Sequence, residues 1–253
     1  MTASTAEHQS AARTAERRAV TALGRTIIAG NAIASLWYWP IVLAITLTIG
    51  FIELRVDAID SSVFLGVGLS VSSFLFVMGI IMSASYLAIH VAAGGTRRAF
   101  AVGIAGAGGF TALWSGVIMT LGLIIERLVF QSQGWPLDHG GLVQLYGGTN
   151  YPLAALVTAL SCAAYYLTGA CVGMAYYRWG GWRGTVLLPV LVLPAFLAEV
   201  SLQSGYFGNP LARGLSIVPT NVPLATLGSL VAIAGAFAML RFITRTIAIR
   251  PVT

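Results

Sequence analysis

The densest group of chemically capable residues is a short polar segment that follows a long apolar run. It reads Ala92-Ala93-Gly94-Gly95-Thr96-Arg97-Arg98-Ala99-Phe100. The two glycines allow a sharp reversal of the chain, and the threonine can cap a helix that starts after it. The two adjacent arginines and the phenylalanine would form a compact basic surface. The segment is therefore either a contact site for a partner or a tight turn whose arginines mark one side of a membrane.

Glu199 is the only acidic residue well inside a long apolar run. A charged carboxylate in hydrocarbon costs about 2.5–3.5 kcal/mol on insertion scales, so its side chain is expected to face protein or water. The cost falls if the chain turns back near Gly205 and leaves Glu199 close to the headgroups. An external gate and a plain interfacial acid are both open interpretations of this residue.

The remaining ionisable residues give weaker signals. His90 ends the run before the basic segment, where it could carry a proton or interact favourably with a helix C-terminus. Asp138 and His139 supply only two ligand types between them, so no metal site is predicted. Cys162 and Cys171 are separated by nine positions, which places them on roughly opposite faces of one helix, so they are not expected to pair.

The sequence lacks the usual catalytic signatures. It contains no His/Cys cluster, no G-x-S-x-G segment and no paired intramembrane carboxylates. It also has no G-x-x-x-x-G-K-[ST] phosphate loop and no lysine to complete one. We therefore expect a protein that is not catalytic on its own and binds no cofactor.

The elements that position these residues are six long apolar stretches. Hydrophobic residues make up 57% of the 253 positions and charged residues only 9%, which excludes an ordinary soluble globule. Each stretch can cross a hydrocarbon core of about 30 Å, which takes about 20 helical residues. The predicted fold is an all-α membrane protein with six transmembrane helices. The expected helices are Ile33–Glu53, Ser62–His90, Arg98–Ile125, Pro152–Tyr177, Thr185–Leu202 and Pro223–Ile243.

The basic residues define an orientation for these helices. With six crossings both termini share a side, together with Arg13, Arg17, Arg18, Arg25, Arg97, Arg98, Arg178, Arg183, Arg241, Arg245 and Arg250. The other side holds only Arg55, Arg127 and Arg213. Since loops rich in arginine stay in the cytoplasm, we expect cytoplasmic termini in a multi-pass protein of the inner or plasma membrane. The net charge of +6 thus marks topology and does not predict nucleic-acid binding.

The N-terminal region carries a modest amphipathic pattern. Val20, Leu23 and Ile27 recur at helical spacing, with Arg18 and Arg25 on the opposite face. This favours a helix lying along the inner membrane surface. The predicted organisation is a cytoplasmic tail with an interfacial helix over 1–32, a transmembrane domain over 33–243 and a cytoplasmic tail over 244–253.

Two further features admit two interpretations each. The second inner loop, Arg178-Trp179-Gly180-Gly181-Trp182-Arg183, could contact a partner or anchor the helices at the membrane surface, and its composition favours anchoring. Small residues recur in the third and fourth expected helices, where they permit close helix approach either within one subunit or between two. These are Gly103, Ala105, Ala107 and Gly109, followed by Gly169 and Gly173.

Three short motifs resemble small actinobacterial permease subunits of ABC-2-type transporters. Gly95-Thr96-Arg97-Arg98-Ala99-Phe100 is similar to the G-V-T-R-R-x-F segment of that family, although Gly94-Gly95 departs from the usual residues before Thr-Arg-Arg. Tyr38-Trp39-Pro40-Ile41 and Gly173-Met174-Ala175-Tyr176-Tyr177-Arg178-Trp179-Gly180 also fit. The resemblance implies a coupling helix at roughly 90–100 that docks on a separate ATPase subunit. It also implies a second permease copy and short re-entrant helices between Leu202 and Val222.

The resulting hypothesis is the permease subunit of an ATP-driven exporter of an amphipathic or lipid-like compound, such as a drug, lipid or hydrophobic peptide. ATP and Mg would bind the partner ATPase, and the permease would form a dimer, most simply of identical chains. The residues expected to couple to the ATPase are His90, Gly94, Gly95, Thr96, Arg97, Arg98, Phe100, Arg178, Trp179 and Arg183, with Glu199 as an external gate. The alternatives are a secondary transporter with Glu199, Glu126 or His90 as proton carriers, and a non-transporting scaffold or immunity protein.

Overall fold

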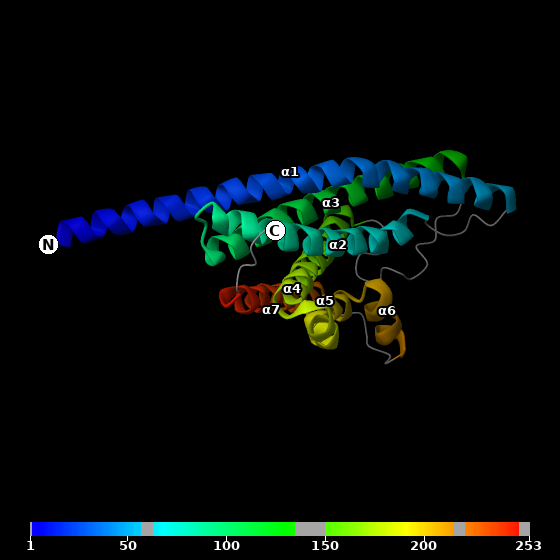
Figure 1. The fold of residues 1–253 in the computed structure, drawn as a ribbon. Coiled ribbons are helices and arrows are strands. Elements are labelled where there is room, and N and C mark those ends of the chain that lie inside the picture. The colour runs from blue at the N-terminus through cyan, green and yellow to red at the C-terminus, as the bar shows by residue number, and fades with distance from the viewer. Residues whose placement is uncertain (1, 57–62, 135–149, 215–220, 248–253) are drawn as a thin grey trace.

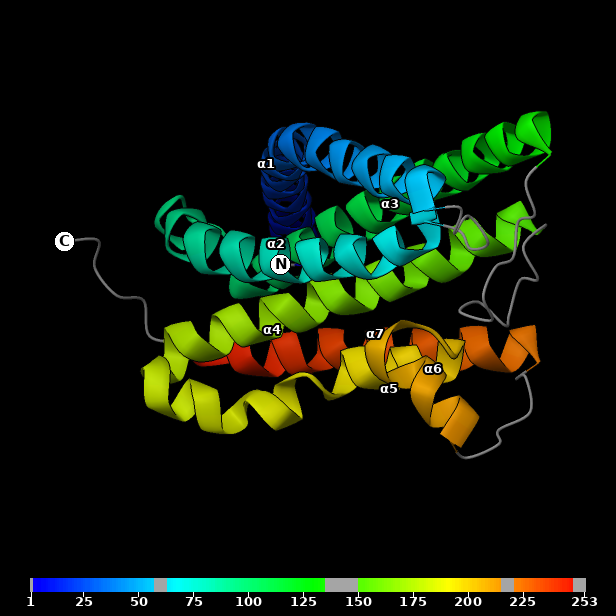
Figure 2. The same ribbon diagram turned by 90° about the vertical axis from the view of Figure 1, so that its right-hand side faces the viewer.

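The computed structural model describes residues 2–56, 63–134, 150–214 and 221–247, and their regular structure is entirely helical. The helices are α1 (Thr2–Val56), α2 (Val63–Ala92), α3 (Arg97–Gln133), α4 (Tyr151–Leu191), α5 (Leu193–Leu202), α6 (Gly205–Gly214) and α7 (Val222–Arg245). Figures 1 and 2 show α1, α2 and α3 on one side of α4, and α5, α6 and α7 on the other. The predicted all-α class is confirmed.

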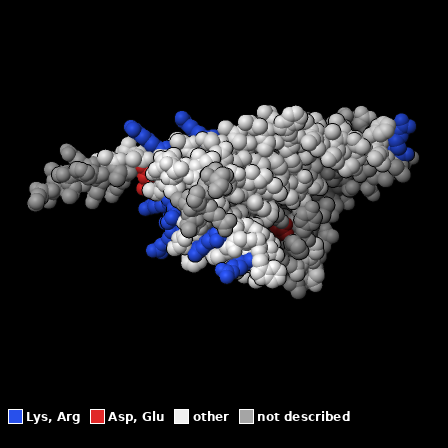
Figure 3. All heavy atoms as spheres, viewed as in Figure 1, with Lys and Arg blue, Asp and Glu red and all other residues white. Residues whose placement is uncertain are grey.

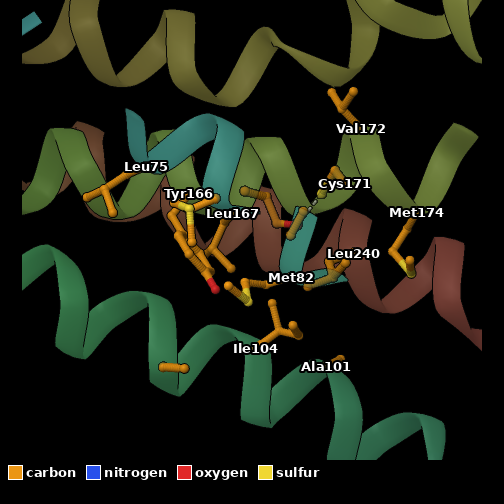
Figure 4. Close-up of a cluster of buried hydrophobic side chains, with 14 of the residues drawn as sticks. Leu75, Met82, Ala101, Ile104, Tyr166, Leu167, Cys171, Val172, Met174 and Leu240 are labelled. Atoms are coloured by element: carbon orange, nitrogen blue, oxygen red, sulfur yellow. Dashed lines mark hydrogen bonds between the residues drawn. The ribbon is translucent and has the colours of Figure 1, made fainter. Parts of the chain in front are cut away.

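Helix α4 is the centre of the bundle. It packs against α2, α3, α5 and α7. Every residue from Tyr166 to Ala175 is buried. Figure 4 shows Leu75, Met82, Tyr166 and Ile104, from α2, α4 and α3, meeting in the main apolar cluster. The core therefore forms where α4 is enclosed by its neighbours.

Five helices among the described residues are long and apolar enough to cross a membrane. Large apolar side chains also point outward along the bundle, including Leu36 and Trp37 on α1, Leu113 on α3 and Val231 on α7. So much exposed apolar surface is unfavourable in water and favourable in lipid. The chain thus has the character of a helical membrane-embedded protein.

The fourth and fifth predicted helices meet at a reversal within α4. Gly180 has φ 79° and ψ −179°, a backbone conformation that glycine adopts readily and other residues avoid. Figure 2 shows the chain turning back there, so that residues 181–191 run alongside residues 151–179 in the opposite direction. After a break at Val192, α5 continues as far as Leu202.

The predicted boundaries of the second and sixth helices are accurate to about two residues. Helix α2 ends at Ala92 and α7 covers Val222–Arg245. Helix α3 extends eight residues beyond its predicted end to Gln133, and Gly134 closes it in a left-handed conformation with φ 69°. The single Glu126-Arg127 pair did not stop this helix.

The N-terminal region differs from its prediction. Helix α1 is continuous through the expected boundary at 32 and 33, and Pro40 lies inside it. Leu23 and Ile27 are buried in the main cluster and pack against α3, where the side chain of Leu23 covers Gly103. The apolar stripe that was expected to lie on the membrane surface is therefore covered by protein.

The glycines of α4 pack against α2 of the same chain. A methyl group on Gly169 would overlap the carbonyl oxygen of Phe76, and one on Gly79 would overlap that of Tyr166. A methyl group on Gly173 would lie 2.7 Å from the carbonyl oxygen of Ile80. Gly169 and Gly173 thus form a contact between α2 and α4 within one subunit, which resolves the alternative for these two glycines.

Candidate functional site

The described arginines gather at one end of the bundle. This basic end carries the turn between α2 and α3, the reversal at Gly180 and the C-terminus of α7, which lie together in Figure 2. Figure 3 shows blue side chains clustered at this end and a smaller basic group at the opposite end. The asymmetry in the sequence therefore corresponds to an asymmetry in space.

The predicted coupling segment is a tight turn. Residues 93–96 connect α2 directly to α3, with Gly94 at φ 83°. The Gly95 amide donates to the carbonyl of His90 at 2.9 Å. The Thr96 hydroxyl caps α3 by accepting from the Ala99 amide at 3.0 Å. Residues 90–100 form no separate coupling helix, because the turn of α2 and the cap of α3 already use this backbone.

His90 and Phe100 are internal to this turn. Phe100 is fully buried, His90 is 8% exposed, and their ring centroids lie 6.0 Å apart. A methyl group on Gly95 would overlap the His90 ring. Among the described residues, His90 Nε2 has no hydrogen-bond partner. Both side chains therefore shape the turn and present little surface to a docking partner.

Two of the arginines predicted to couple to a partner cap α7 in the structure. Arg97 donates to the carbonyl oxygens of Arg245 at 3.3 Å and Ile247 at 2.7 Å. Arg178 donates to the carbonyl oxygen of Ile243 at 3.1 Å. Carbonyls at a helix C-terminus lack helical partners and carry partial negative charge, which guanidinium groups stabilise. The turn at residues 93–96 and the reversal at Gly180 are thereby joined to the end of α7.

Removing the Arg97 cap should destabilise the bundle. Arg97→Ala is expected to lower the free energy of unfolding by about 2 kcal/mol, because charge-assisted hydrogen bonds to carbonyls are lost. Arg98→Ala is the matched control and is expected to change stability by less than about 0.5 kcal/mol. Unfolding monitored in detergent by denaturant titration measures both. Equal stability of the two variants would contradict the capping role.

The exposed residues of the basic end are fewer than the sequence suggested. The Arg98 side chain is 70% exposed and lies 3.7 Å from the Glu16 carboxylate, a contact that contributes little in water. Arg183 is exposed, and Trp182 is 81% exposed. Trp179 is half-buried, 4.6 Å from the Arg178 guanidinium. Arg98 and Arg183 are thus predicted coupling residues that are exposed, and Trp182, from the loop for which the sequence favoured anchoring, is exposed beside Arg183.

The Tyr38-Trp39-Pro40-Ile41 motif joins α1 to α2. The Tyr38 ring stacks on Phe74 with centroids 4.2 Å apart, and its hydroxyl hydrogen-bonds Ser70 at 2.9 Å. The motif therefore has an internal packing role.

A second candidate site surrounds Glu199. A cavity of about 590 Å³ opens between α2, α4 and α5, and we call it the Glu199 cavity. Its walls are Ser73, Phe76, Val77, Tyr165, Pro189, Val192, Leu193, Ala195, Phe196 and Glu199. The volume lies within the range of about 300–1,000 Å³ that is typical of ligand pockets. The sequence identified the acid but not the cavity, because its walls come from three separated segments.

The carboxylate of this cavity is held by protein. Glu199 is 1% exposed, and the Tyr165 hydroxyl donates to its Oε1. The chain turns back just beyond it, with Gln203 at φ 49° and Gly205 at φ 79°. A side chain at Gly205 would overlap the carboxylate, so glycine is required there. The chain thus turns back near Gly205, and the Glu199 side chain faces protein.

Among the described residues, the remaining candidates form no further site. Asp138 and His139 lie outside the described residues. Within the described ranges there is no group of three or more His, Cys, Asp or Glu that could hold a metal ion. Cys162 and Cys171 are both buried and free, as expected. Glu126 is half-buried on α3, away from the Glu199 cavity.

Comparison with known proteins places no further constraint on these sites. No protein-family model, no curated protein and no solved structure matches the chain.

Proposed function

We propose that this protein is the permease subunit of an ABC-2-type exporter, which moves an amphipathic or lipid-like compound and works with a separate ATPase subunit. The Glu199 cavity is the observation that carries the proposal. Its walls are almost wholly apolar, with a serine, a tyrosine hydroxyl and one carboxylate among them. Such a wall suits a molecule with a large apolar part and a small polar part.

The topology of a six-crossing exporter agrees with the helix arrangement. The reversal at Gly180 supports two separate crossings, by residues 151–179 and 181–202, in addition to those of α1, α2, α3 and α7. Helix α6 is short and follows a tight turn, which supports a re-entrant hairpin before α7. The basic end then lies on the cytoplasmic side of the plasma membrane, since arginine-rich loops stay in the cytoplasm.

The coupling surface in this proposal is the exposed part of the basic end. Arg98, Trp182 and Arg183 would contact the ATPase, which supplies the ATP and Mg sites. Arg97 and Arg178 would pass movement of the two inner turns to α7 through its carbonyls. A second permease copy would complete the transporter, and α3 offers an open small residue for contact with it at Gly109.

The test is affinity purification of the tagged protein from its native membrane, with mass spectrometry of the co-purifying chains. An ATPase subunit is expected with the wild type. The double variant Arg98→Glu/Arg183→Glu is expected to recover at least about tenfold less of it, because unfavourable charge at an interface costs several kcal/mol. Arg55→Glu, an exposed position near the end of α1, is the matched control and should behave as wild type.

Three outcomes separate the possibilities. Loss of the ATPase only in the double variant supports both the function and the coupling surface. Recovery of the ATPase with every variant supports the function but removes Arg98 and Arg183 from the interface. Absence of any ATPase, even after chemical crosslinking in the membrane, contradicts the proposal.

A proton-coupled secondary transporter is the second candidate, and the buried Tyr165–Glu199 pair is the observation that favours it. A carboxylate inside a membrane protein can bind and release a proton during transport. Transport by purified protein in proteoliposomes, driven by a pH gradient without ATP and lost in Glu199→Gln, would establish this alternative.

A further inference from the structure

A cavity at the basic end is lined by four arginines. It measures about 340 Å³ and lies between the start of α3 and the end of α7. Its walls are Arg97, Arg98, Arg241, Phe242, Thr244 and Arg245. We call it the arginine cavity. It is distinct from the Glu199 cavity, with which it shares no residue.

The charge of this cavity is only partly compensated by the protein. Arg97 is committed to the carbonyls at the end of α7, which also offsets the negative end of that helix. The Nε atom of Arg98 lies 3.7 Å from the carboxylate oxygen Oε1 of Glu16, which is a weak ion pair. Within the described part of the chain, the side chains of Arg241 and Arg245 form no ion pair. Cations that share one cavity repel each other, so an anion bound among them would be strongly favoured.

The backbone adds to this preference for an anion. Arg97 and Arg98 are the first two residues of α3, whose N-terminus carries partial positive charge. Thr96 satisfies one amide of this turn, that of Ala99. The helix end and the guanidinium groups therefore act in the same direction, and planar guanidinium groups match the oxygens of a phosphate.

The position of the cavity indicates where the phosphate comes from. Phe242 lines the cavity and is 70% exposed, so an apolar side chain pointing outward lies beside the arginines. The outer face of α7 continues with exposed Leu227, Leu230 and Val231 toward the other end of the bundle. A free phosphate would use only the arginines, whereas a phospholipid would use the arginines and this apolar face together.

We propose that the arginine cavity binds the phosphate headgroup of an anionic phospholipid from the cytoplasmic leaflet, with the acyl chains lying along α7. Arg241 and Arg245 are the main headgroup ligands, because neither guanidinium group forms an ion pair with another described residue. The bound lipid holds α3 and α7 together at the basic end. This inference goes beyond the proposed exporter function, and only its assignment to the cytoplasmic leaflet rests on the orientation proposed there.

The test uses the purified full-length protein in a neutral detergent, with thermal unfolding as the readout. Phosphatidylglycerol is added to the micelles at increasing mole fraction, and phosphatidylcholine serves as the zwitterionic comparison. Phosphatidylglycerol is expected to raise the unfolding temperature of the wild type, and phosphatidylcholine is expected to leave it unchanged. In Arg241→Gln/Arg245→Gln the half-saturating mole fraction of phosphatidylglycerol should rise about 30-fold, since each arginine near an anionic lipid contributes about a fivefold gain in affinity.

Controls separate the source of the phosphate and the role of general charge. Arg183→Gln removes an exposed arginine of the same end that does not line the cavity, and it should leave the lipid response as in wild type. Native mass spectrometry should show retained phosphatidylglycerol on the wild type and its loss from the double variant. An equal response of the double variant, or equal stabilisation by phosphatidylcholine, would overturn the proposal. Equal stabilisation by inorganic phosphate would overturn the assignment to a lipid.

Discussion

Replacing Gly169 with alanine is expected to prevent stable assembly of the helix bundle. The added methyl group would overlap the backbone carbonyl of Phe76 on α2, and backbone cannot move aside as a flexible side chain can. The same surface contains Gly79, whose own methyl group would overlap the carbonyl of Tyr166, so α2 cannot shift along α4 to make room. We expect a loss of about 3 kcal/mol or more, at the upper end of overpacking effects.

Gly106→Ala is the matched control for this prediction. Gly106 is also in a helix and exposed, and nothing lies within 4 Å of a methyl group placed there. Alanine should therefore be neutral or slightly stabilising, by up to about 1 kcal/mol from helix propensity. The fraction of protein that elutes as a monodisperse species in detergent, and its unfolding temperature, measure both variants. A Gly169→Ala protein as stable as Gly106→Ala would contradict the close α2–α4 contact.

In the exporter proposed above, filling the Glu199 cavity is expected to reduce transport strongly without unfolding the protein. Leu193 lines the cavity from α5 and is 47% exposed, so a tryptophan there can occupy the cavity without displacing the core. In the assembled transporter, Leu193→Trp should reduce cargo-stimulated ATP turnover by about tenfold or more, because the indole ring fills the space that the cargo would occupy. Basal turnover reports whether the variant still assembles with the ATPase.

Leu197→Trp provides the comparison for the cavity variant. Leu197 lies one helical turn further along α5, is 51% exposed and does not line the cavity. Its replacement should leave cargo stimulation within about twofold of wild type. If both tryptophans reduce stimulation equally, the effect belongs to the surface of α5 and the Glu199 cavity is not the cargo site.

The positions of α2 and α7 were predictable because hydrophobic run length is a local property. The uncharged stretch before the Gly94-Gly95 turn predicted α2 almost to the residue, and the prolines and arginines around Val222–Arg245 predicted α7. The gathering of arginines at one end was also predictable, since alternate loops of a multi-crossing chain meet on one side. These features require no knowledge of which helices touch.

The individual roles of the site residues were not predictable, because they depend on contacts between distant segments. Arg97 binds carbonyls 148 and 150 positions later in the chain, and nothing near Arg97 encodes that partner. Tyr165 and Glu199 are 34 positions apart and belong to different helices. The stripe of Leu23 and Ile27 was correctly identified as apolar, but its period could not distinguish lipid from α3 as the surface that covers it.

The two capping arginines also impose an order on biogenesis. Arg97 and Arg178 leave the ribosome well before the carbonyls of Ile243, Arg245 and Ile247 that accept their hydrogen bonds. Until α7 has been synthesised and inserted, two guanidinium groups remain at the membrane surface without these partners. Closure of the basic end is thus a late event that requires a completed α7.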